Sequence, residues 1–357
     1  MSRLKIISKL IGMVVLKSIA LAILVIVGLD ATAEFIDESK MIKNNYGVTN
    51  VFEYVFTTLP SSISEYFPFA VLIGCLFGIG QLSSSNELIV IRASGVSKYK
   101  IFWFALKPVL LLVLLVSLSN EFITPYLDQK AEGNRDYLRK GSSFQTSVDG
   151  LWINDGDQFI NVSAVFPGGV LYGVSRYTID SERRLSRASF ASRAVYNESE
   201  KLWVEENLSI TIINSSSTST EKFVTKPWIS DLTPEILTIN FLPPEALAIR
   251  TLGRHIDFLD KQNTDTTTFL LPFLQKLFNP LLVVTLTLIA VGTAMGPLRD
   301  STMGYRLFLG VVFGVSLKIV QDLLGSFTLV YGYPIILGVT IPICLCLLVG
   351  FILNRAR

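Results

Sequence analysis

The most informative pattern in this chain is the distribution of its long apolar stretches. Each is close to the roughly 20 residues that a helix needs to cross a hydrocarbon core about 30 Å thick. Three precede and three follow a polar segment of about 121–265. The six stretches are Ile11–Leu29, Phe67–Leu82, Ile101–Leu118, Phe269–Ala294, Leu307–Leu324 and Ile335–Leu353. The pattern predicts transmembrane helices 1–3 within 1–120, an inserted water-soluble domain over 121–265, and transmembrane helices 4–6 within 266–357.

Lys and Arg residues in the short segments predict how the chain is oriented in the membrane. Basic residues in short loops mark the cytoplasmic side, whereas a long domain crosses whatever its charge. The clusters on one side are Arg3, Lys5 and Lys9, then Arg92, Lys98 and Lys100, then Arg299 and Arg306, then Arg355 and Arg357. The loop Ser326–Pro334 carries no charge. We therefore expect both termini in the cytoplasm and the inserted domain on the opposite side, with the first stretch kept as an anchor.

Composition narrows the class of protein further. Half of the residues are hydrophobic and only 17% are charged, which is unusual for a soluble protein. The net charge of +2, without a basic run, argues against a nucleic-acid partner. The three cysteines, Cys75, Cys344 and Cys346, lie inside apolar stretches, so the inserted domain has no disulfide framework. His255 is the only histidine. No metal site, cofactor motif or catalytic motif is evident, so we expect a non-enzymatic chain.

The inserted domain is predicted to be mostly β-strand. Short segments rich in β-branched and aromatic residues alternate with turn-forming clusters such as Pro167-Gly168-Gly169. The predicted strands are Gln158–Phe166, Val170–Ile179, Arg187–Tyr196, Lys201–Ile213 and Lys222–Ile229. Regular short strands of this kind favour a sandwich or a jelly roll, with an interior that is either filled or open to acyl chains. After them, Arg250–Lys261 has the spacing of a short amphipathic helix leading into span four.

The loop between spans two and three predicts a short cytoplasmic helix within 84–95. Ser and Asn residues before Glu87 can cap its start, and Gly95 can end it. The helix would have about two turns, with Leu88, Ile89 and Ile91 as its apolar residues. It is either a plain interfacial helix on lipid or a coupling helix that seats in a groove on a cytoplasmic motor subunit.

Charged and small residues inside the spans are further candidates for function. Ionisable groups are expensive in hydrocarbon and commonly functional there. Lys107 and Lys276 lie in spans three and four, and Lys318 and Asp322 are four residues apart in span five, where they either neutralise one another or contact a ligand. Two G-x-x-x-G pairs, Gly74/Gly78 and Gly310/Gly314, could line a shared helix interface.

Several segments together resemble the YjgP/YjgQ permease family over essentially the whole chain. The second span and the following loop, Phe67–Gly95, carry the main resemblance. Gly150-Leu151-Trp152 with Asp155-Gly156 is similar to the family's entry into its external jelly roll. The last two loops are similar at Gly296-Pro297-Leu298-Arg299, Met303-Gly304 and Leu329-Val330-Tyr331-Gly332-Tyr333-Pro334.

The resemblance implies a permease subunit of an ABC transporter in the inner membrane of a Gram-negative bacterium. Such a transporter extracts lipopolysaccharide and passes it to a periplasmic bridge toward the outer membrane. The implied partners are an LptF-like six-span permease, an LptB-like ATPase dimer, and LptC-like and LptA-like bridge proteins. By position, the residues matching the ATPase-coupling helix are Glu87, Leu88, Arg92, Ala93, Ser94 and Gly95.

Basic residues near the periplasmic ends of the spans are the candidate lipid contacts. The resemblance implies Lys40, Arg135 and Lys276, and a phosphorylated lipid head needs cations at the membrane surface. Placement just outside spans one and three adds Lys43, Arg139 and Lys140. Glu34 stands where relatives can carry a basic residue, and Gln321-Asp322 reverses a related Asp-Gln order.

Other functions remain open at the level of sequence. The chain could be an LptF-type subunit of the same complex, a mechanotransmission-type ABC permease, or a secondary transporter for another lipid. A membrane-anchored scaffold would need no coupling helix, and a secondary transporter would need no ATPase. Co-purification with an ATPase and identification of the bound lipid separate these alternatives.

Overall fold

The computed structural model describes residues 2–140, 151–155, 158–180, 182, 184–214, 217–230, 232–261, 265–295 and 302–355. The features expected at Gly150, Gly156, Gly296-Pro297-Leu298-Arg299 and Arg357 lie outside these residues. The chain divides into two compact units. The first comprises Met1–Thr32, Leu59–Phe122 and Ala248–Arg357, and the second comprises Ala33–Thr58 and Ile123–Leu247.

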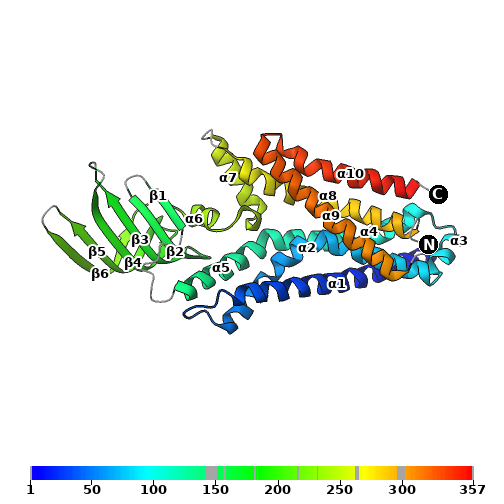
Figure 1. Ribbon diagram of the computed structural model, residues 1–357, viewed down its shortest axis with the longest axis horizontal. Coiled ribbons are helices and arrows are strands. Elements are labelled where there is room, and N and C mark those ends of the chain that lie inside the picture. Colours follow the sequence, from blue (N-terminus) through cyan, green and yellow to red (C-terminus); the bar gives the residue numbers. More distant parts are fainter. Residues whose placement is uncertain are drawn as a thin grey trace. The chain divides into compact units, whose positions relative to one another are not determined.

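Among the residues that the structure describes, six helices are long and apolar enough to cross a membrane, which confirms the six predicted spans. They are α1 (Ser2–Ser39), α2 (Val48–Ser84), α4 (Lys98–Phe122), α8 (Thr267–Met295), α9 (Met303–Tyr331) and α10 (Ile335–Arg355) (Figure 1). The first two extend well beyond their apolar stretches, because the adjoining polar residues also favour helix. These extensions carry the last turns of α1 and the first turns of α2 into the second unit.

Small residues set the spacing of helices in the first unit. A Cβ atom at Gly74 of α2 would lie 2.5 Å from the Cα of Ile19, so α1 packs directly on the α2 backbone. Gly310 and Gly314 of α9 face Leu76 and Phe69 of α2 instead. The two glycine pairs therefore serve two different interfaces of α2, rather than the single shared interface that the sequence suggests.

Arg306 makes a polar contact in the same unit that the sequence did not reveal. Its side chain is 1% exposed and donates a hydrogen bond from Nη1 to the carbonyl of Gly80 in α2. A Cβ atom at Gly80 would overlap this guanidinium, so the arginine needs a glycine there. Arg306 is one of the basic residues that predict the orientation of the chain in the membrane, and it also connects α9 to the end of α2.

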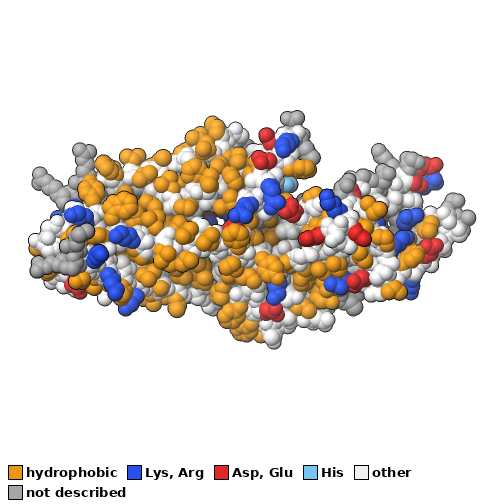
Figure 2. Space-filling view, turned by 180° about the vertical axis from the view of Figure 1, so that it is seen from behind, with side chains coloured by type: hydrophobic (Ala, Val, Ile, Leu, Met, Phe, Trp, Pro, Cys, Tyr) orange, Lys and Arg blue, Asp and Glu red, His pale blue; other side chains and the backbone are white. Residues whose placement is uncertain are grey.

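Hydrophobic side chains cover most of the visible face of the helical part in Figure 2. On α9, exposed hydrophobic side chains include Phe308, Val315 and Leu323, which are 61%, 55% and 64% exposed. Such a surface suits contact with lipid. The helix α7 (Ile249–Lys261) confirms the predicted amphipathic helix, and its Leu252 is fully buried.

The second unit contains a single six-stranded antiparallel sheet, which confirms the inserted all-β domain. Its strands follow one another in sequence order, as in a meander, rather than being shared between the two sheets of a sandwich. They are β1 (Leu151–Asp155), β2 (Gln158–Phe166), β3 (Val170–Ile179), β4 (Leu185–Asn197), β5 (Leu202–Ile213) and β6 (Thr218–Trp228). The five predicted strands are present as β2 to β6. The sequence does not predict β1, because this strand is only five residues long and ends in two polar residues.

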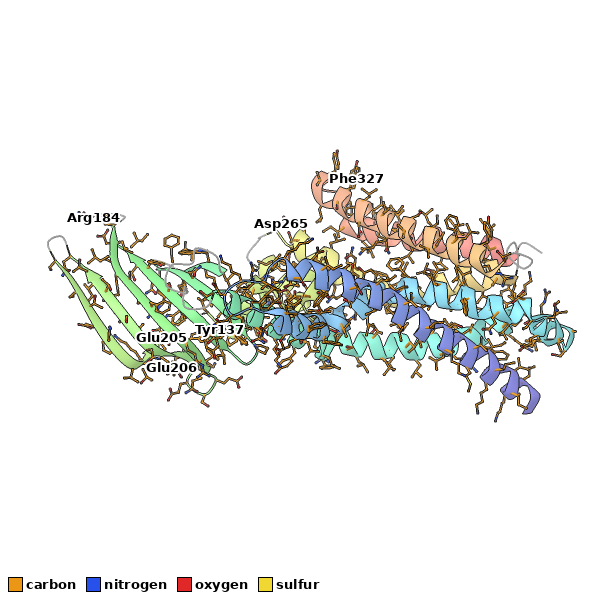
Figure 3. The ribbon with its side chains drawn as sticks, turned by 60° about the horizontal axis from the view of Figure 1, so that its bottom comes forward. Tyr137, Arg184, Glu205, Glu206, Asp265 and Phe327 are labelled. Carbon is orange, nitrogen blue, oxygen red and sulfur yellow. The ribbon has the colours of Figure 1, made fainter. Side chains whose placement is uncertain are left out.

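Helices accompany the sheet in the second unit, where the sequence indicated mainly strands. They are α5 (Thr124–Lys140), α6 (Pro234–Phe241) and the 3-10 turn η2 (Pro244–Ala246). α5 packs on β2 with so little space that a Cβ at Gly133 would lie 2.7 Å from the carbonyl of Val165. Tyr137 of α5, labelled in Figure 3, extends this contact to Phe166 and Tyr172. The α5 segment contains few apolar residues, so its sequence shows only a weak amphipathic helix pattern.

A line of irregular residues crosses the sheet and changes which side chains face its core. Four residues on neighbouring strands, Ser163, Gly173, Ser192 and Asn207, face one another without pairing, and the register is the same on both sides of this row. Gly173 and Asn207 have positive φ angles of 61° and 50°. The left-handed backbone at Asn207 changes the alternation on β5, where the buried positions step by three, from Glu205 to Leu208, instead of by two.

The core of the sheet combines aromatic side chains with a buried ion pair. Trp203 is fully buried, stacks near Trp228 and donates from Nε1 to the carbonyl of Leu232 at 2.8 Å. Beside them, Arg176 Nη2 lies 2.6 Å from Glu205 Oε2 (Glu205 is labelled in Figure 3). Burial raises the pKa of the Glu205 carboxyl, and the charge of Arg176 opposes that shift.

The close approach of α1 and α2 predicts the effect of enlarging Gly74. Gly74→Ala should lower the free energy of unfolding by about 2 kcal/mol, because the added methyl meets the Ile19 backbone. The matched control is Gly28→Ala in α1, where no atom lies within 4 Å, and where alanine should be neutral or stabilising by about 0.5 kcal/mol. Thermal unfolding in detergent compares the two, and equal effects would contradict the packing described.

Candidate functional site

The loop between α2 and α4 holds the predicted short helix, α3 (Glu87–Ala93). It begins after Asn86, which adopts a left-handed conformation (φ 62°) and makes no side-chain capping bond. The expected capping by Ser and Asn is therefore wrong, because Asn86 turns the chain between two helices only two residues apart. Gly95 ends the helix as predicted, with φ 87° and a bond from its amide to the carbonyl of Arg92.

One side of α3 is fixed in the core and the other is open. Leu88 and Ile91 are 4% and 6% exposed and belong to the same hydrophobic cluster as the membrane helices. Ile89, predicted with them, is exposed instead. Of the predicted coupling residues, those on the open side are Glu87, Arg92, Ala93, Ser94 and Gly95, and the neighbouring Val90 is 68% exposed. Leu88 anchors the helix and is not available to a partner.

The predicted lipid-contact residues Lys43, Arg135 and Arg139 gather in the second unit around Tyr46. Lys43 pairs with Tyr46 through the backbone, and the side-chain amide of Asn44 donates to the carbonyl of Arg139. Burial and then the carboxylate of Glu38 raise the pKa of Tyr46, while the charges of Arg135 and Arg139 oppose this. Both arginines are therefore close to the tyrosine.

Arg135 is the centre of a hydrogen-bonded cluster that the sequence did not reveal. Its guanidinium bonds Glu38 of α1 at 3.1 Å, the hydroxyl of Tyr54 of α2 at 3.0 Å, and Glu132 of α5. It also lies over the Tyr54 ring, 5.1 Å from its centroid. Of these contacts, only the one between Arg135 and Glu132 could be anticipated from the sequence, because the two residues are three apart on a helix.

Nearby carboxylates keep Arg135 charged. Burial lowers the pKa of Arg135, but Glu132, Tyr54 and Glu38 raise it by more, so the net shift is upward. Burial raises the pKa of Glu132, and Arg135 and the Tyr54 hydroxyl oppose that rise. Arg135 thus stays a cation, but two carboxylates already compete for it.

A small pocket adjoins the cluster. The polar residues in its lining are Tyr46, Asn50, Glu53, Tyr54, Thr57, Lys130, Asn134 and Arg135. Lys130 is exposed at this pocket and was not among the predicted contacts. Amide, ammonium and phenol groups together can donate hydrogen bonds to an anionic group.

The remaining predicted cations have different surroundings. Lys40 is 70% exposed and pairs with Asp37 at 2.7 Å, one turn earlier on α1. Lys276 is half-buried in α8 of the first unit. Lys107 lies 5.6 Å from the centroid of the Phe104 ring. Glu34 accepts a hydrogen bond from Thr58 at 3.1 Å.

Comparison with known proteins agrees with this architecture along almost the entire chain. Residues 9–356 match the family described as lipopolysaccharide export system permease LptF/LptG. The chain belongs to this permease family. The predicted resemblance is confirmed, and six apolar helices together with this membership indicate a multi-pass inner-membrane protein.

Relatives within the LptF/LptG family are similar over most of their length. The lipopolysaccharide export system permease protein LptG of Escherichia coli (strain K12) is 30% identical over 342 residues, which cover 94% of each chain. LptG of Haemophilus influenzae is also 30% identical, over 97% of this chain and 98% of its own. These relatives are permeases and are not described as enzymes.

The Arg135 cluster predicts a structural role that Lys40 does not share. Arg135→Lys should lower the free energy of unfolding by about 2–4 kcal/mol, because one ammonium cannot satisfy Glu38, Glu132 and Tyr54 together. Lys40→Gln is the control and should change stability by less than about 0.5 kcal/mol, since its pair is exposed. Thermal unfolding in detergent measures both. If Arg135→Lys is as stable as the unsubstituted protein, the structural role is wrong and Arg135 is a substrate contact instead.

Proposed function

We propose that the chain is an LptG-type permease subunit of an ABC transporter that extracts lipopolysaccharide from the inner membrane. The family match over 9–356 carries the proposal, and relatives named LptG support the subunit type. In this proposal a periplasmic bridge of LptC-like and LptA-like proteins receives the lipid and delivers it toward the outer membrane. The β domain of about 121–265 lies in the periplasm, which the Lys and Arg distribution supports.

The energy for transport comes from a separate LptB-like ATPase dimer that docks on α3. The support is the two-sided construction of this helix. Leu88 and Ile91 fix it to the membrane helices, while Glu87, Val90 and Arg92 are exposed. A helix held this way moves as one piece with α2 and α4, so a displacement at the ATPase reaches the membrane spans.

The lipid head is held by cations of the second unit, and an LptF-like permease completes the path. Lys40, Lys43 and Arg139 are the proposed contacts, joined by Lys130 at the pocket. Arg135 contributes by holding α1, α2 and α5 together. Lys276 contacts the substrate from α8. Charged hydrogen bonds of this type contribute roughly 1.5–3 kcal/mol each.

Charge reversal on the open side of α3 tests the coupling. Glu87→Arg should reduce lipid-stimulated ATP hydrolysis of the assembled transporter at least tenfold, because a reversed charge at a protein contact costs several kcal/mol. Ser97→Arg is a matched control beyond the helix and should hydrolyse ATP normally. Gly95→Trp should act like Glu87→Arg. Normal stimulation in both variants would leave α3 as a lipid-facing helix.

Photo-crosslinking tests the substrate and its contacts. A benzophenone amino acid at position 40 or 43 should capture lipopolysaccharide in cells, because these exposed positions adjoin the proposed phosphate contacts. Position 198, in the exposed turn between β4 and β5, is the control and should capture none. If position 276 captures lipopolysaccharide and neither 40 nor 43 does, the head group is bound by the first unit rather than the second.

A further inference from the structure

One lysine of α4 lies well inside the membrane span, on a face that is otherwise apolar. Lys100 is in the first turn of α4, and Lys107 follows seven residues later, about 10 Å further along the helix axis. Both side chains are exposed, and beyond Lys107 the same face continues with the exposed Leu111 and Leu114. Because hydrocarbon cannot solvate an ammonium group, a lysine on such a face needs a polar partner or a route to the membrane surface.

The side chain of Lys107 extends back toward Lys100. Its Nζ lies 5.6 Å from the centroid of the Phe104 ring, one turn nearer to the start of the helix. Helical side chains lean toward the N-terminus, and a long lysine can follow this direction to bring its charge to the membrane surface. Seven residues are almost two full turns, so Lys100 and Lys107 lie on one face of α4. Their ammonium groups therefore approach the same depth in the bilayer.

A lysine of α1 lies beside this face. Both helices begin at the end of the first unit that carries the N-terminus (Figure 1). Gly12 of α1 packs on α4, where a Cβ atom would be 3.8 Å from the Phe104 carbonyl and 3.9 Å from the ring of Pro108. Lys9, three residues before Gly12, is exposed, and helical rotation turns it to the same side of this contact as Lys107. We call Lys9, Lys100 and Lys107 the lysine face.

The helices around the lysine face carry no acidic residues at this level. α1 has none before Asp30, α4 has none before Glu121, and α8, which packs on α4, has none at all. None of the ion pairs among the described residues includes a lysine of this face. Lys and Arg side chains gather at the end of the helical part where these helices begin (Figure 2). The positive charge of the lysine face is therefore not balanced by the chain's own helices.

The charge and the depth of the lysine face identify its occupant. Three ammonium groups attract an anion, and the exposed leucines of α4 beyond them suit acyl chains. We propose that the lysine face binds the head group of an anionic glycerophospholipid, in the leaflet where α1 and α4 begin. That this leaflet is the cytoplasmic one rests on the proposed function, whereas the charge of the ligand follows from the lysines. The residues are separate from the proposed contacts of the exported lipid.

Trp103 can report the bound lipid. It is 57% exposed and lies between Lys100 and Lys107 along α4, whereas the other three tryptophans, Trp152, Trp203 and Trp228, belong to the β domain. The full chain is placed in phosphatidylcholine vesicles, and its fluorescence is quenched with brominated phosphatidylglycerol or brominated phosphatidylcholine at equal mole fraction. The emission of Trp103→Phe supplies the background of the β domain. Phosphatidylglycerol should bind beside Trp103 at least about fivefold more tightly, because each lysine near an anionic head group adds a several-fold preference. Equal quenching by the two lipids would overturn the proposal.

Variants that remove one charge locate the binding site. Lys107→Gln and Lys9→Gln should each lower the preference for phosphatidylglycerol at least about threefold, and Lys107→Arg should retain it. The matched control is Lys17→Gln, which removes an exposed lysine about 140° around α1 from Gly12 and should leave the preference unchanged. An equal loss in Lys17→Gln and Lys107→Gln would show attraction to the overall charge and overturn the site, as would a normal preference in Lys107→Gln.

The leaflet is tested separately from the lipid. A cysteine in Ser97→Cys, just before α4, should react with a membrane-impermeant thiol reagent from the cytoplasmic side only. Reaction from the periplasmic side, with the preference for phosphatidylglycerol intact, would contradict the orientation in the proposed function and move the bound lipid to the other leaflet. Loss of the preference with the expected labelling would overturn the lipid site alone.

Discussion

Hydrocarbon offers no hydrogen bonds, and this constraint accounts for most of the polar contacts in the helical unit. Arg306 is buried in that unit only because Gly80 leaves its carbonyl within reach and leaves space for the guanidinium. Lys107 lies over an aromatic ring, and Lys318 lies between two carboxylates. The partners that Arg306 and Lys318 find on α2 depend on helix spacing, which in turn depends on glycines such as Gly310.

The same principle takes a different form in the second unit, where one cation joins three segments distant in sequence. Arg135 brings together the end of α1, the start of α2 and the middle of α5. Bonds from one half-buried cation to three groups fix their relative positions, and removing one of these groups leaves a charge without its partner. The pocket beside this network is consequently built on a fixed frame. Its exposed cation, Lys130, can adjust to a ligand without disturbing that frame.

Patterns that depend on local periodicity could be read from the sequence, and contacts between distant residues could not. Apolar length predicts the six spans, and alternation with turn residues predicts β2 and β3 with their observed bounds. The α5 helix has too few apolar residues to produce a clear period. Glu38 and Tyr54 carry no local sign that they bond Arg135, because that depends on how α1 and α2 return toward α5. The outward direction of Val90 and the inward direction of Leu88 likewise required the packed structure.

The unpaired row in the sheet has a consequence for how the β domain tolerates substitution. Simple alternation along β5 from Leu208 would turn Glu205 away from the core, yet the left-handed backbone at Asn207 returns it to Arg176. An extended conformation at Asn207 would therefore rotate the segment that contains Trp203 to the outer surface, although every hydrophobic residue remained in the chain. The interior of this domain is defined by backbone conformation as much as by residue type. A β-branched residue at position 207, which disfavours a positive φ angle, is equivalent to several simultaneous core substitutions.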